Sequence, residues 1–207
     1  MIKKIAHRGY SALYGDNNLI SFKKAIENHF DGIELDIRLN MNNNIVIYHD
    51  SYINNKLIKE LSNDEIIKYK ILKLKDFFDK INISNTEILL DLKDDDNLAK
   101  ELIKFFDKYK INKKNIIVAS FNINYLKELK NSGFKLGYTT CNNYTSYNFI
   151  DNIDYILVDF NIISEEFIKE IKKKNKIIYC FTCYDKYQLD LLKNYNIDGI
   201  ISNIKID

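Results

Sequence analysis

Short apolar segments alternate with longer amphipathic segments along the whole chain. Eight of the apolar segments predict β-strands, over Lys3–His7, Gly32–Ile37, Glu87–Leu92, Asn115–Ser120, Lys135–Thr139, Tyr155–Asp159, Lys176–Thr182 and Gly199–Ser202. Apolar side chains at helical spacing predict helices between most of them, over Leu19–Asn28, Asn97–Tyr109, Ile123–Asn131, Glu165–Lys174 and Tyr187–Tyr195. This alternation is typical of a parallel sheet with crossover helices.

Eight such strands predict an α/β fold, a (β/α)8 TIM barrel, with an open doubly wound sheet as the alternative. Polar side chains favour the barrel, because they fall at or just after the C-terminal ends of strands, where a barrel builds its active site. These side chains belong to His7, Asp36, Lys93, Ser120, Thr140, Asp159 and Thr182. No Gly/Ser linker, charge block or repeat divides the chain, so residues 1–207 are expected to form one domain.

The stretch after the second strand predicts a small β-hairpin excursion from the barrel. Too few residues separate Asp36 from the apolar segment Ile45–Tyr48 for the crossover that a parallel neighbour needs. Ile45–Tyr48 should therefore return antiparallel, with Asn42–Asn44 in the turn. Such a hairpin would bring His49 near Asp36. Two short helices are expected to follow within Leu61–Ile81 before the third strand.

Two pairs of charged residues lie at i and i+2 in predicted strands. Glu34 and Asp36 share one face of the second strand, where burial is costly unless a cation lies between them. A divalent cation with oxygen ligands is the usual partner, and helix capping or surface charge is the alternative. Asp91 and Lys93 share a face of the third strand in the same way. They predict either a buried ion pair or a third metal carboxylate beside a phosphate-binding ammonium.

The chain contains three histidines, and two of them lie beside strand-end acids. His7 closes the first strand and can act as an acid or a base near neutral pH. Arg8 follows it with a planar fork suited to phosphate, and Gly9 permits a sharp turn. His49 ends the hairpin. His29 ends a predicted helix, where an imidazolium suits the helix C-terminus, so a structural or surface role is expected.

Composition and charge narrow the classes of function. A net charge of +2 offers no electrostatic case for binding nucleic acid or an anionic membrane. No apolar run has the length of a signal peptide or a transmembrane helix, so we expect a cytoplasmic protein without stable membrane insertion. Cys180 and Cys183 are three apart in a predicted strand and should face opposite sides. We therefore expect buried free thiols in a reducing compartment, without a disulfide.

Taken together, these motifs resemble the glycerophosphodiester phosphodiesterase family of the phospholipase-C-like phosphodiesterase superfamily. HRG at residues 7–9 matches the family's opening motif, and GIELDIRL…IVIYHD (32–50) matches its Glu-Leu-Asp and His-Asp motifs in order and spacing. Other similar segments are GDNNLISFKKA (15–25), LKLKDFF (72–78), LLDLK (89–93), ASFN (119–122), CFTC (180–183) and DGIISN (198–203). The resemblance covers nearly the whole chain.

The resemblance implies an enzyme of lipid metabolism that hydrolyses glycerophosphodiesters to an alcohol and sn-glycerol 3-phosphate. By this resemblance, Glu34, Asp36 and Asp91 would hold one divalent metal ion, Mg or Ca. His7 and His49 would be the catalytic acid–base pair. One imidazole would activate the attacking hydroxyl, from water or from a neighbouring glycerol hydroxyl, and the other would protonate the departing alcohol.

The same resemblance assigns residues around the substrate, which would be a small-molecule glycerophosphodiester. Arg8 and Lys93 would contact the phosphate, and both would stabilise the charge that develops in the transition state. Asp16 and Asn17 would support the first loop, and Asp50 would support the site beside His49. The sequence predicts neither the head group nor the oligomeric state.

Three positions depart from the family pattern, with Asp16 and Asp91 where Glu is usual and Asn203 where Asp is usual. Both Asp residues retain a carboxylate, and the Asn203 position is interpreted as structural, so we expect an active enzyme. Two alternatives remain: a phospholipase-D-like enzyme acting on lysophospholipid or sphingolipid, and an inactive phosphoester-binding protein. The long substrate-covering insertion of some members is absent, since only Ser51–Thr86 separates the hairpin from the third strand. We therefore expect an open pocket.

Overall fold

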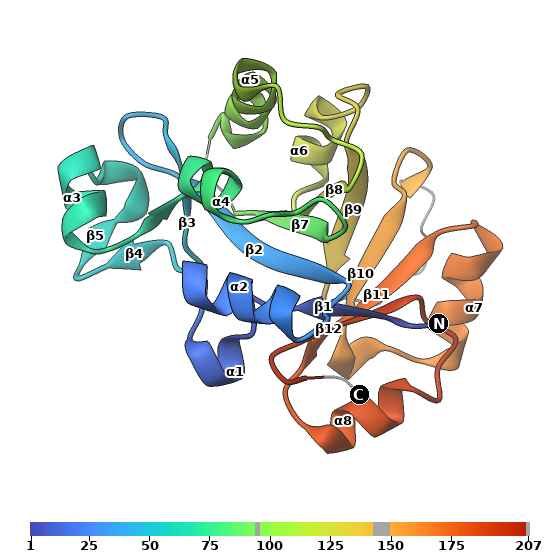
Figure 1. Ribbon diagram of the computed structural model, residues 1–207. Helices are drawn as coiled ribbons and strands as arrows, with labels where there is room; N and C mark the ends of the chain where they lie inside the picture. Colours follow the sequence, from blue (N-terminus) through green and yellow to red (C-terminus); the bar gives the residue numbers. More distant parts are fainter. Residues whose placement is uncertain (94–95, 143–149, 206–207) are drawn as a thin grey trace.

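The computed structural model describes residues 1–93, 96–142 and 150–205 (Figure 1). Eight parallel strands close into a barrel, because the first strand pairs with both the second and the last. In order around the barrel they are β1 (Lys3–Ala6), β2 (Gly32–Leu39), β7 (Glu87–Leu92), β8 (Ile116–Ser120), β9 (Lys135–Thr140), β10 (Tyr155–Asp159), β11 (Ile177–Cys183) and β12 (Gly199–Ser202). The predicted (β/α)8 barrel is confirmed, and each predicted barrel strand is found.

Helices cover the outside of the barrel (Figure 1). They are α1 (Ser11–Tyr14), α2 (Leu19–Glu27), α4 (Leu74–Lys80), α5 (Leu98–Tyr109), α6 (Ile123–Glu128), α7 (Glu165–Lys173) and α8 (Lys186–Leu192). The five helices predicted from periodicity are confirmed, although α6 and α8 end three residues earlier than expected. Polar caps determine where several begin, with Asn18, Ser164 and Asp185 accepting from the first-turn N–H groups of α2, α7 and α8. Residues 143–149 of the connection before β10 lie outside the described residues.

The hairpin excursion forms as expected and lies apart from the barrel, at the left of Figure 1. Strand β3 (Ile45–Ile47) pairs antiparallel with the end of β2, and Asn40 closes the turn by accepting from the backbone N–H groups of Asn42 and Asn44. Helix α3 (Asn63–Lys68) starts at a capping box formed by Ser62 and Glu65. The remaining elements of the excursion are β4 (Tyr52–Ile53), β5 (Lys56–Leu57), η1 (Ile58–Glu60) and β6 (Leu72–Lys73).

The alternation of side chains in the strands separates an inner core from an outer one. In β7, Leu89 packs inside the barrel against Leu157 and Ile201, whereas Leu90 packs outward in the cluster beneath the helices. The side chain of Asp91, two residues after Leu89, therefore faces the barrel interior at its C-terminal end. The apolar inner core thus forms the floor beneath a polar layer of strand-end residues.

Strand β11 corrects one expectation about the cysteines. The register between β11 and β12 shifts between Cys180 and Cys183, and both thiols lie in the same outer core cluster. The expected placement on opposite sides is wrong, because this irregularity changes the alternation. Both cysteines are nevertheless free and buried, as expected. Burial raises the pKa of each thiol, so neither is a reactive thiolate.

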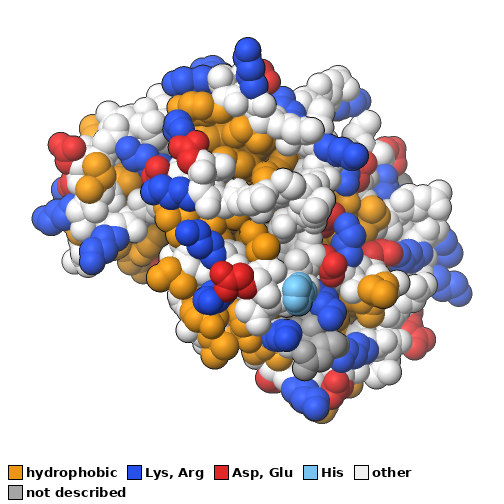
Figure 2. Space-filling model, viewed as in Figure 1, with side chains coloured by type: hydrophobic (Ala, Val, Ile, Leu, Met, Phe, Trp, Pro, Cys, Tyr) orange, Lys and Arg blue, Asp and Glu red, His pale blue; other side chains and the backbone are white. Residues whose placement is uncertain are grey.

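The outer surface in Figure 2 shows acidic and basic side chains interspersed. Hydrophobic side chains gather over α1 and α2, where the side chains of Leu13 and Ile20 are largely exposed. Among the described residues, no helix is both long enough and apolar enough to span a bilayer.

Candidate active site

The loop after β1 is held in a strained conformation by a close approach to α2. Gly9 has φ of +81°, and a Cβ on it would lie 2.4 Å from Ser21 Oγ. Arg8 also has a positive φ, and its carbonyl accepts hydrogen bonds from the Ser21 hydroxyl and the Asn17 backbone N–H. The loop thereby directs the Arg8 backbone N–H to Glu34 Oε2, at 2.9 Å. The sharp turn at Gly9 thus connects the first loop to the carboxylates of β2.

Substituting Gly9 by Ala is expected to destabilise the protein and reduce its activity, because the Cβ would displace the Arg8 loop. The matched control is Gly133→Ala, since Gly133 has φ of +84° but its added Cβ would meet no atom nearer than 3.7 Å. The control should lose about 1–2 kcal/mol from backbone strain alone. Gly9→Ala should lose about 1–3 kcal/mol more from overpacking. Urea unfolding of both variants checks this, and equal losses would contradict it.

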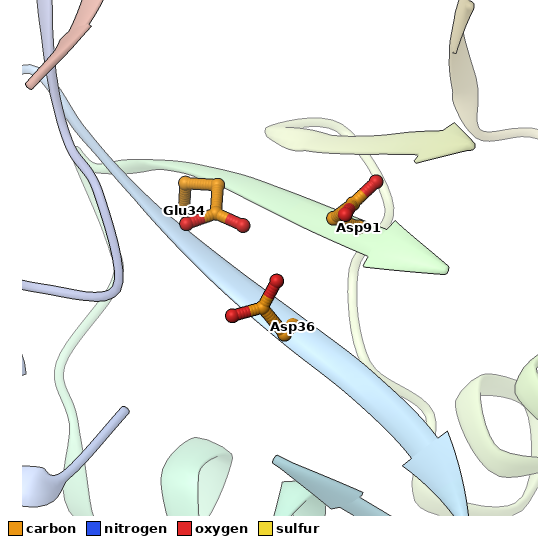
Figure 3. Close-up of side chains that lie close together, drawn as sticks. All are labelled: Glu34, Asp36 and Asp91. Atoms are coloured by element: carbon orange, nitrogen blue, oxygen red, sulfur yellow. The ribbon is translucent and has the colours of Figure 1, made fainter. Parts of the chain in front are cut away.

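Three carboxylates converge at the C-terminal end of β2 and β7. Glu34 and Asp36 lie on β2, Asp91 lies directly beside Asp36 on β7, and the three side chains lie close together (Figure 3). All three residues are buried, and one oxygen of each lies within 4.8 Å of the others. Asp91 Oδ1 is buried without a hydrogen-bond partner among the described residues. This oxygen-only donor set with an unsatisfied atom fits a hard divalent cation such as Mg²⁺ or Ca²⁺.

Two cationic side chains reach the carboxylates from either side. Lys93 Nζ lies 2.7 Å from Asp36 Oδ1 and 2.5 Å from Asp91 Oδ2. Arg8 Nε lies 3.1 Å from Asp36 Oδ2, yet it is buried without a well-aligned hydrogen bond, and Arg8 Nη1 lies 2.9 Å from Asp16 Oδ2. The site therefore holds an unsatisfied acceptor on Asp91 and an unsatisfied donor on Arg8.

The three carboxyl groups differ in the direction in which their surroundings shift their pKa values. Burial raises the pKa of Glu34 well above its usual value, and Asp36 and Asp91 add to this effect. Burial likewise raises the pKa of Asp91. Burial would also raise the pKa of Asp36, but the charges of Lys93 and Arg8 outweigh it and lower that pKa. Negative charge at Glu34 and Asp91 is thus undercompensated, which favours binding of an added cation.

His7 faces Glu34 from the end of β1. Its Nδ1 lies 2.6 Å from Asn203 Oδ1, and its Nε2 lies 3.9 Å from Glu34 Oε2. Because an amide oxygen accepts, Nδ1 carries the proton and Nε2 is left as the acceptor. Burial lowers the pKa of His7 to about 4, and Arg8 contributes to the shift. Asn203 was interpreted as structural from the sequence, but it orients the His7 ring directly.

His49 lies on the same cavity, at the end of the hairpin. Its Nδ1 lies 2.7 Å from Asp50 Oδ1, and its side chain is 43% exposed. Its backbone carbonyl accepts hydrogen bonds from Arg38 Nε and Nη2 at 3.0 and 2.9 Å. Tyr48 N–H donates to the Asp36 carbonyl at 3.0 Å, which ties the hairpin to the carboxylate strand. The hairpin thus brings His49 to the same site as Asp36.

Seven of the predicted site residues line one cavity of about 380 Å³ at the C-terminal end of the barrel. Its floor is formed by inner-core side chains, Leu89, Thr139, Leu157 and Ile201. One wall carries the carboxylates, the two histidines, Arg8 and Lys93. The opposite wall is formed by Phe121, Asp159, Phe160, Asn161, Phe181, Thr182, Tyr184 and Gln188. The cavity is therefore charged on one side and largely aromatic on the other.

Comparison with known proteins identifies the family. The model of the glycerophosphoryl diester phosphodiesterase family matches residues 7–204. The chain belongs to this family. It is 25% identical to the glycerophosphodiester phosphodiesterase of Caldanaerobacter subterraneus subsp. tengcongensis, over 96% of this chain and 93% of that protein.

Two solved structures share the fold over nearly their whole length. A glycerophosphodiester phosphodiesterase from Thermotoga maritima is 26% identical, with a TM-score of 0.84, and the match covers 98% of this chain and 95% of that one. An Oleispira antarctica phosphodiesterase in complex with the product sn-glycerol-3-phosphate is 21% identical, with a TM-score of 0.87, covering 97% and 92%. The barrel is therefore that of the glycerophosphoryl diester phosphodiesterase family.

The residues predicted for the site of this phosphodiesterase-family chain lie together. His7, Arg8, Glu34, Asp36, His49, Asp91 and Lys93 line the one cavity. Asp16 contacts Arg8 at 2.9 Å, Asn17 Nδ2 donates to Asp36 Oδ2 at 2.7 Å, and Asp50 contacts His49. Their catalytic, ligand and supporting roles stay predictions, and each of these three supporting residues contacts another residue predicted for the site.

Of the remaining strand-end residues, Asp159 and Thr182 line the cavity as expected, whereas Ser120 and Thr140 do not. Ser120 and Thr140 donate to backbone carbonyls, of Leu92 and Asn142.

A phospholipase-D-like enzyme should carry an apolar rim that receives an acyl chain, and six aromatic residues are candidates from the sequence: Tyr10, Tyr14, Phe121, Tyr138, Tyr144 and Phe181. Of these, Phe121 and Phe181 line the cavity. Tyr10 and Tyr138 are buried in the outer core, Tyr14 is exposed outside the cavity, and Tyr144 lies outside the described residues. Sequence patterns gave no signal for Phe160, Tyr184 and Gln188, because these residues follow strand ends in irregular segments or begin a helix.

Proposed function

We propose that this protein hydrolyses glycerophosphodiesters to an alcohol and sn-glycerol 3-phosphate in a reaction that requires a divalent metal and two histidines. The observation that carries the proposal is the unsatisfied pair in one cavity, a carboxylate oxygen of Asp91 and a guanidinium nitrogen of Arg8. A divalent cation beside a phosphodiester anion would satisfy both. Membership of the family and the product bound to the Oleispira phosphodiesterase support the choice of substrate.

Glu34, Asp36 and Asp91 would hold one divalent metal ion, Mg²⁺ or Ca²⁺, since all three offer carboxylate oxygens within 4.8 Å of one another. When bound, the ion would neutralise charge on the non-bridging oxygens of the phosphodiester. Asn17, through its hydrogen bond to Asp36, keeps that carboxylate oriented toward the site.

Arg8 and Lys93 would bind the phosphate. Both are the cations nearest to the carboxylates in the part of the chain that the structure describes, and both line the cavity. Asp16 contacts Nη1 of the Arg8 guanidinium, and Nε of the same guanidinium lies 3.1 Å from Asp36 Oδ2. The two positive charges would counter the charge that develops on the phosphoryl oxygens as the attacking oxygen approaches.

His7 and His49 would transfer the protons of the reaction. His7 Nε2 is free to accept, so His7 suits the base that takes a proton from the attacking hydroxyl. That hydroxyl belongs to water or to the neighbouring glycerol carbon. His49 lines the same cavity, and the contact of its Nδ1 with Asp50 orients the ring, so His49 would be the acid that protonates the departing alcohol.

The proposal predicts which phosphorus–oxygen bond breaks. Incubating the protein with glycerophosphocholine and Mg²⁺ or Ca²⁺ should give sn-glycerol 3-phosphate as the final phosphorus-containing product, because the alcohol leaves from the side of the phosphate away from glycerol. Phosphorus NMR of the reaction distinguishes this product from its alternatives. Phosphocholine would contradict the proposed bond. A lysophospholipid cleaved where glycerophosphocholine is not would favour a phospholipase-D-like enzyme, and binding without turnover would favour an inactive phosphoester-binding protein.

A further inference from the structure

The wall of the cavity opposite the carboxylates combines aromatic rings with one acid. Phe121 follows β8 and Phe181 lies in β11, and their rings meet edge to face with centroids 6.2 Å apart. Phe160 and Tyr184 continue the aromatic lining. Asp159, the last residue of β10, is the acid on this wall. The wall is thus separate from the residues that would hold metal and phosphate.

The carboxylate of Asp159 keeps an uncompensated negative charge. Its Oδ1 accepts hydrogen bonds from the backbone N–H and the side-chain amide of Asn161, both at 2.8 Å. Its Oδ2 is approached by the weak donor Cys141 Sγ at 3.7 Å. No Lys, Arg or His side chain in residues 1–93, 96–142 and 150–205 forms an ion pair with Asp159.

Asp159 lies across the barrel from the proposed metal ligands. Its strand, β10, is four strands away from β2 in either direction around the closed barrel. Two of the other acids that line the cavity, Asp36 and Asp91, form ion pairs with Arg8 or Lys93. Asp159 is therefore an acid of the cavity that has no cationic partner among the described residues.

We propose that Asp159 and the aromatic wall select diesters whose alcohol carries a positively charged amine. This inference rests on the proposed function and names the substrate class of the same site. An ammonium group would contact Oδ2 of Asp159 in place of the weak Cys141 thiol donor, and it would contact the faces of aromatic rings that line the same cavity, such as Phe121. A cavity of about 380 Å³ accommodates glycerophosphate with a small amino alcohol.

The test compares two diesters that differ in the charge of the alcohol. Glycerophosphocholine carries a cationic alcohol and glycerophosphoglycerol a neutral one. For the wild-type protein with Mg²⁺ or Ca²⁺, kcat/KM should be about tenfold higher for glycerophosphocholine, from one ion pair and one cation–π contact. In Asp159→Asn most of this ratio should disappear. The loss should come mainly from a higher KM for glycerophosphocholine, because the contact is present both in the bound substrate and in the transition state.

The Asp159→Asn variant removes the negative charge of the side chain but can keep its hydrogen bond to the backbone. Asp159 caps the turn that follows β10, and the amide oxygen of Asn can still accept from the Asn161 N–H. Asp185→Asn is the matched control, since Asp185 caps α8 and does not line the cavity. Phe121→Leu is a second variant, because Phe121 is 48% exposed and its loss removes the ring with little loss of packing.

The results show whether Asp159 and the aromatic rings select diesters with a cationic alcohol. A substrate ratio that falls in Asp159→Asn and in Phe121→Leu, but not in Asp185→Asn, supports the inference. Equal kcat/KM values for the two diesters in the wild type would overturn it and leave the proposed function intact. A preference that persists in Asp159→Asn would overturn it as well. Failure to hydrolyse either diester with either metal would overturn the proposed function and this inference together.

Discussion

Replacing either His7 or His49 by Ala is expected to lower kcat for glycerophosphodiester hydrolysis by about 10²–10⁴-fold, the usual contribution of one positioned proton transfer. Both imidazoles line the cavity that holds the carboxylates, and each is oriented through Nδ1, by Asn203 and by Asp50 respectively. Removing either ring deletes the group that moves a proton but leaves the carboxylates in place. Initial rates at saturating metal and substrate measure the effect.

The chain provides its own control for this pair. His29 is exposed at the C-terminal end of α2, and it does not line the cavity. His29→Ala should therefore retain wild-type kcat. His49 is 43% exposed, so His49→Ala should also keep nearly the wild-type melting temperature, which excludes unfolding as the cause of lost activity. Equal activities of the His29 and His49 variants would contradict the acid–base assignment.

Glu34→Gln is expected to abolish most of the stabilisation that the protein gains from a divalent metal. A ligand at 100 times its Kd stabilises the folded state by about 2.7 kcal/mol. For a chain of this size that corresponds to a rise of about 5–10 °C in melting temperature. Gln retains an oxygen to accept from the Arg8 N–H, but it removes the negative charge that a hard cation requires. The variant should therefore lose both the thermal shift and metal-dependent turnover.

Thermal unfolding with and without Mg²⁺ or Ca²⁺ measures this effect without relying on catalysis. Glu60→Gln is the matched control, because Glu60 is exposed in the excursion and does not line the cavity. The control should show the full wild-type shift. An unchanged shift in Glu34→Gln would mean that the metal binds elsewhere and would remove Glu34 from the proposed ligands.

The fold could be predicted because its strands and helices are local patterns of apolar residues. The hairpin was predictable for a related reason, since the distance from Asp36 to Ile45 excludes a crossover. Elements that span only about one period of these patterns gave no signal, as with α1, β4 and β5. The slip in β11 is also local to the backbone and reverses the face on which Cys183 falls.

The site could be predicted in part, where acids and histidines stand at fixed spacings within strands or at their ends. Glu34 and Asp36 are adjacent on one strand face, and Asp91 joins them through the pairing of β2 with β7. Contacts between distant segments left no such pattern. The contact between His7 and Asn203 joins residues 196 positions apart, and the aromatic wall is assembled from several loops. Tertiary structure was needed to find both.

We propose that a metal ion held by Glu34, Asp36 and Asp91 is required for this protein to hydrolyse glycerophosphodiesters. The decisive measurement is release of sn-glycerol 3-phosphate from glycerophosphocholine by the wild-type protein in Mg²⁺, in Ca²⁺ and in EDTA. We expect release with at least one of the two metals, loss of release in EDTA, and recovery when the metal is restored. Undiminished release in EDTA, or no release by folded protein with either metal, would contradict it.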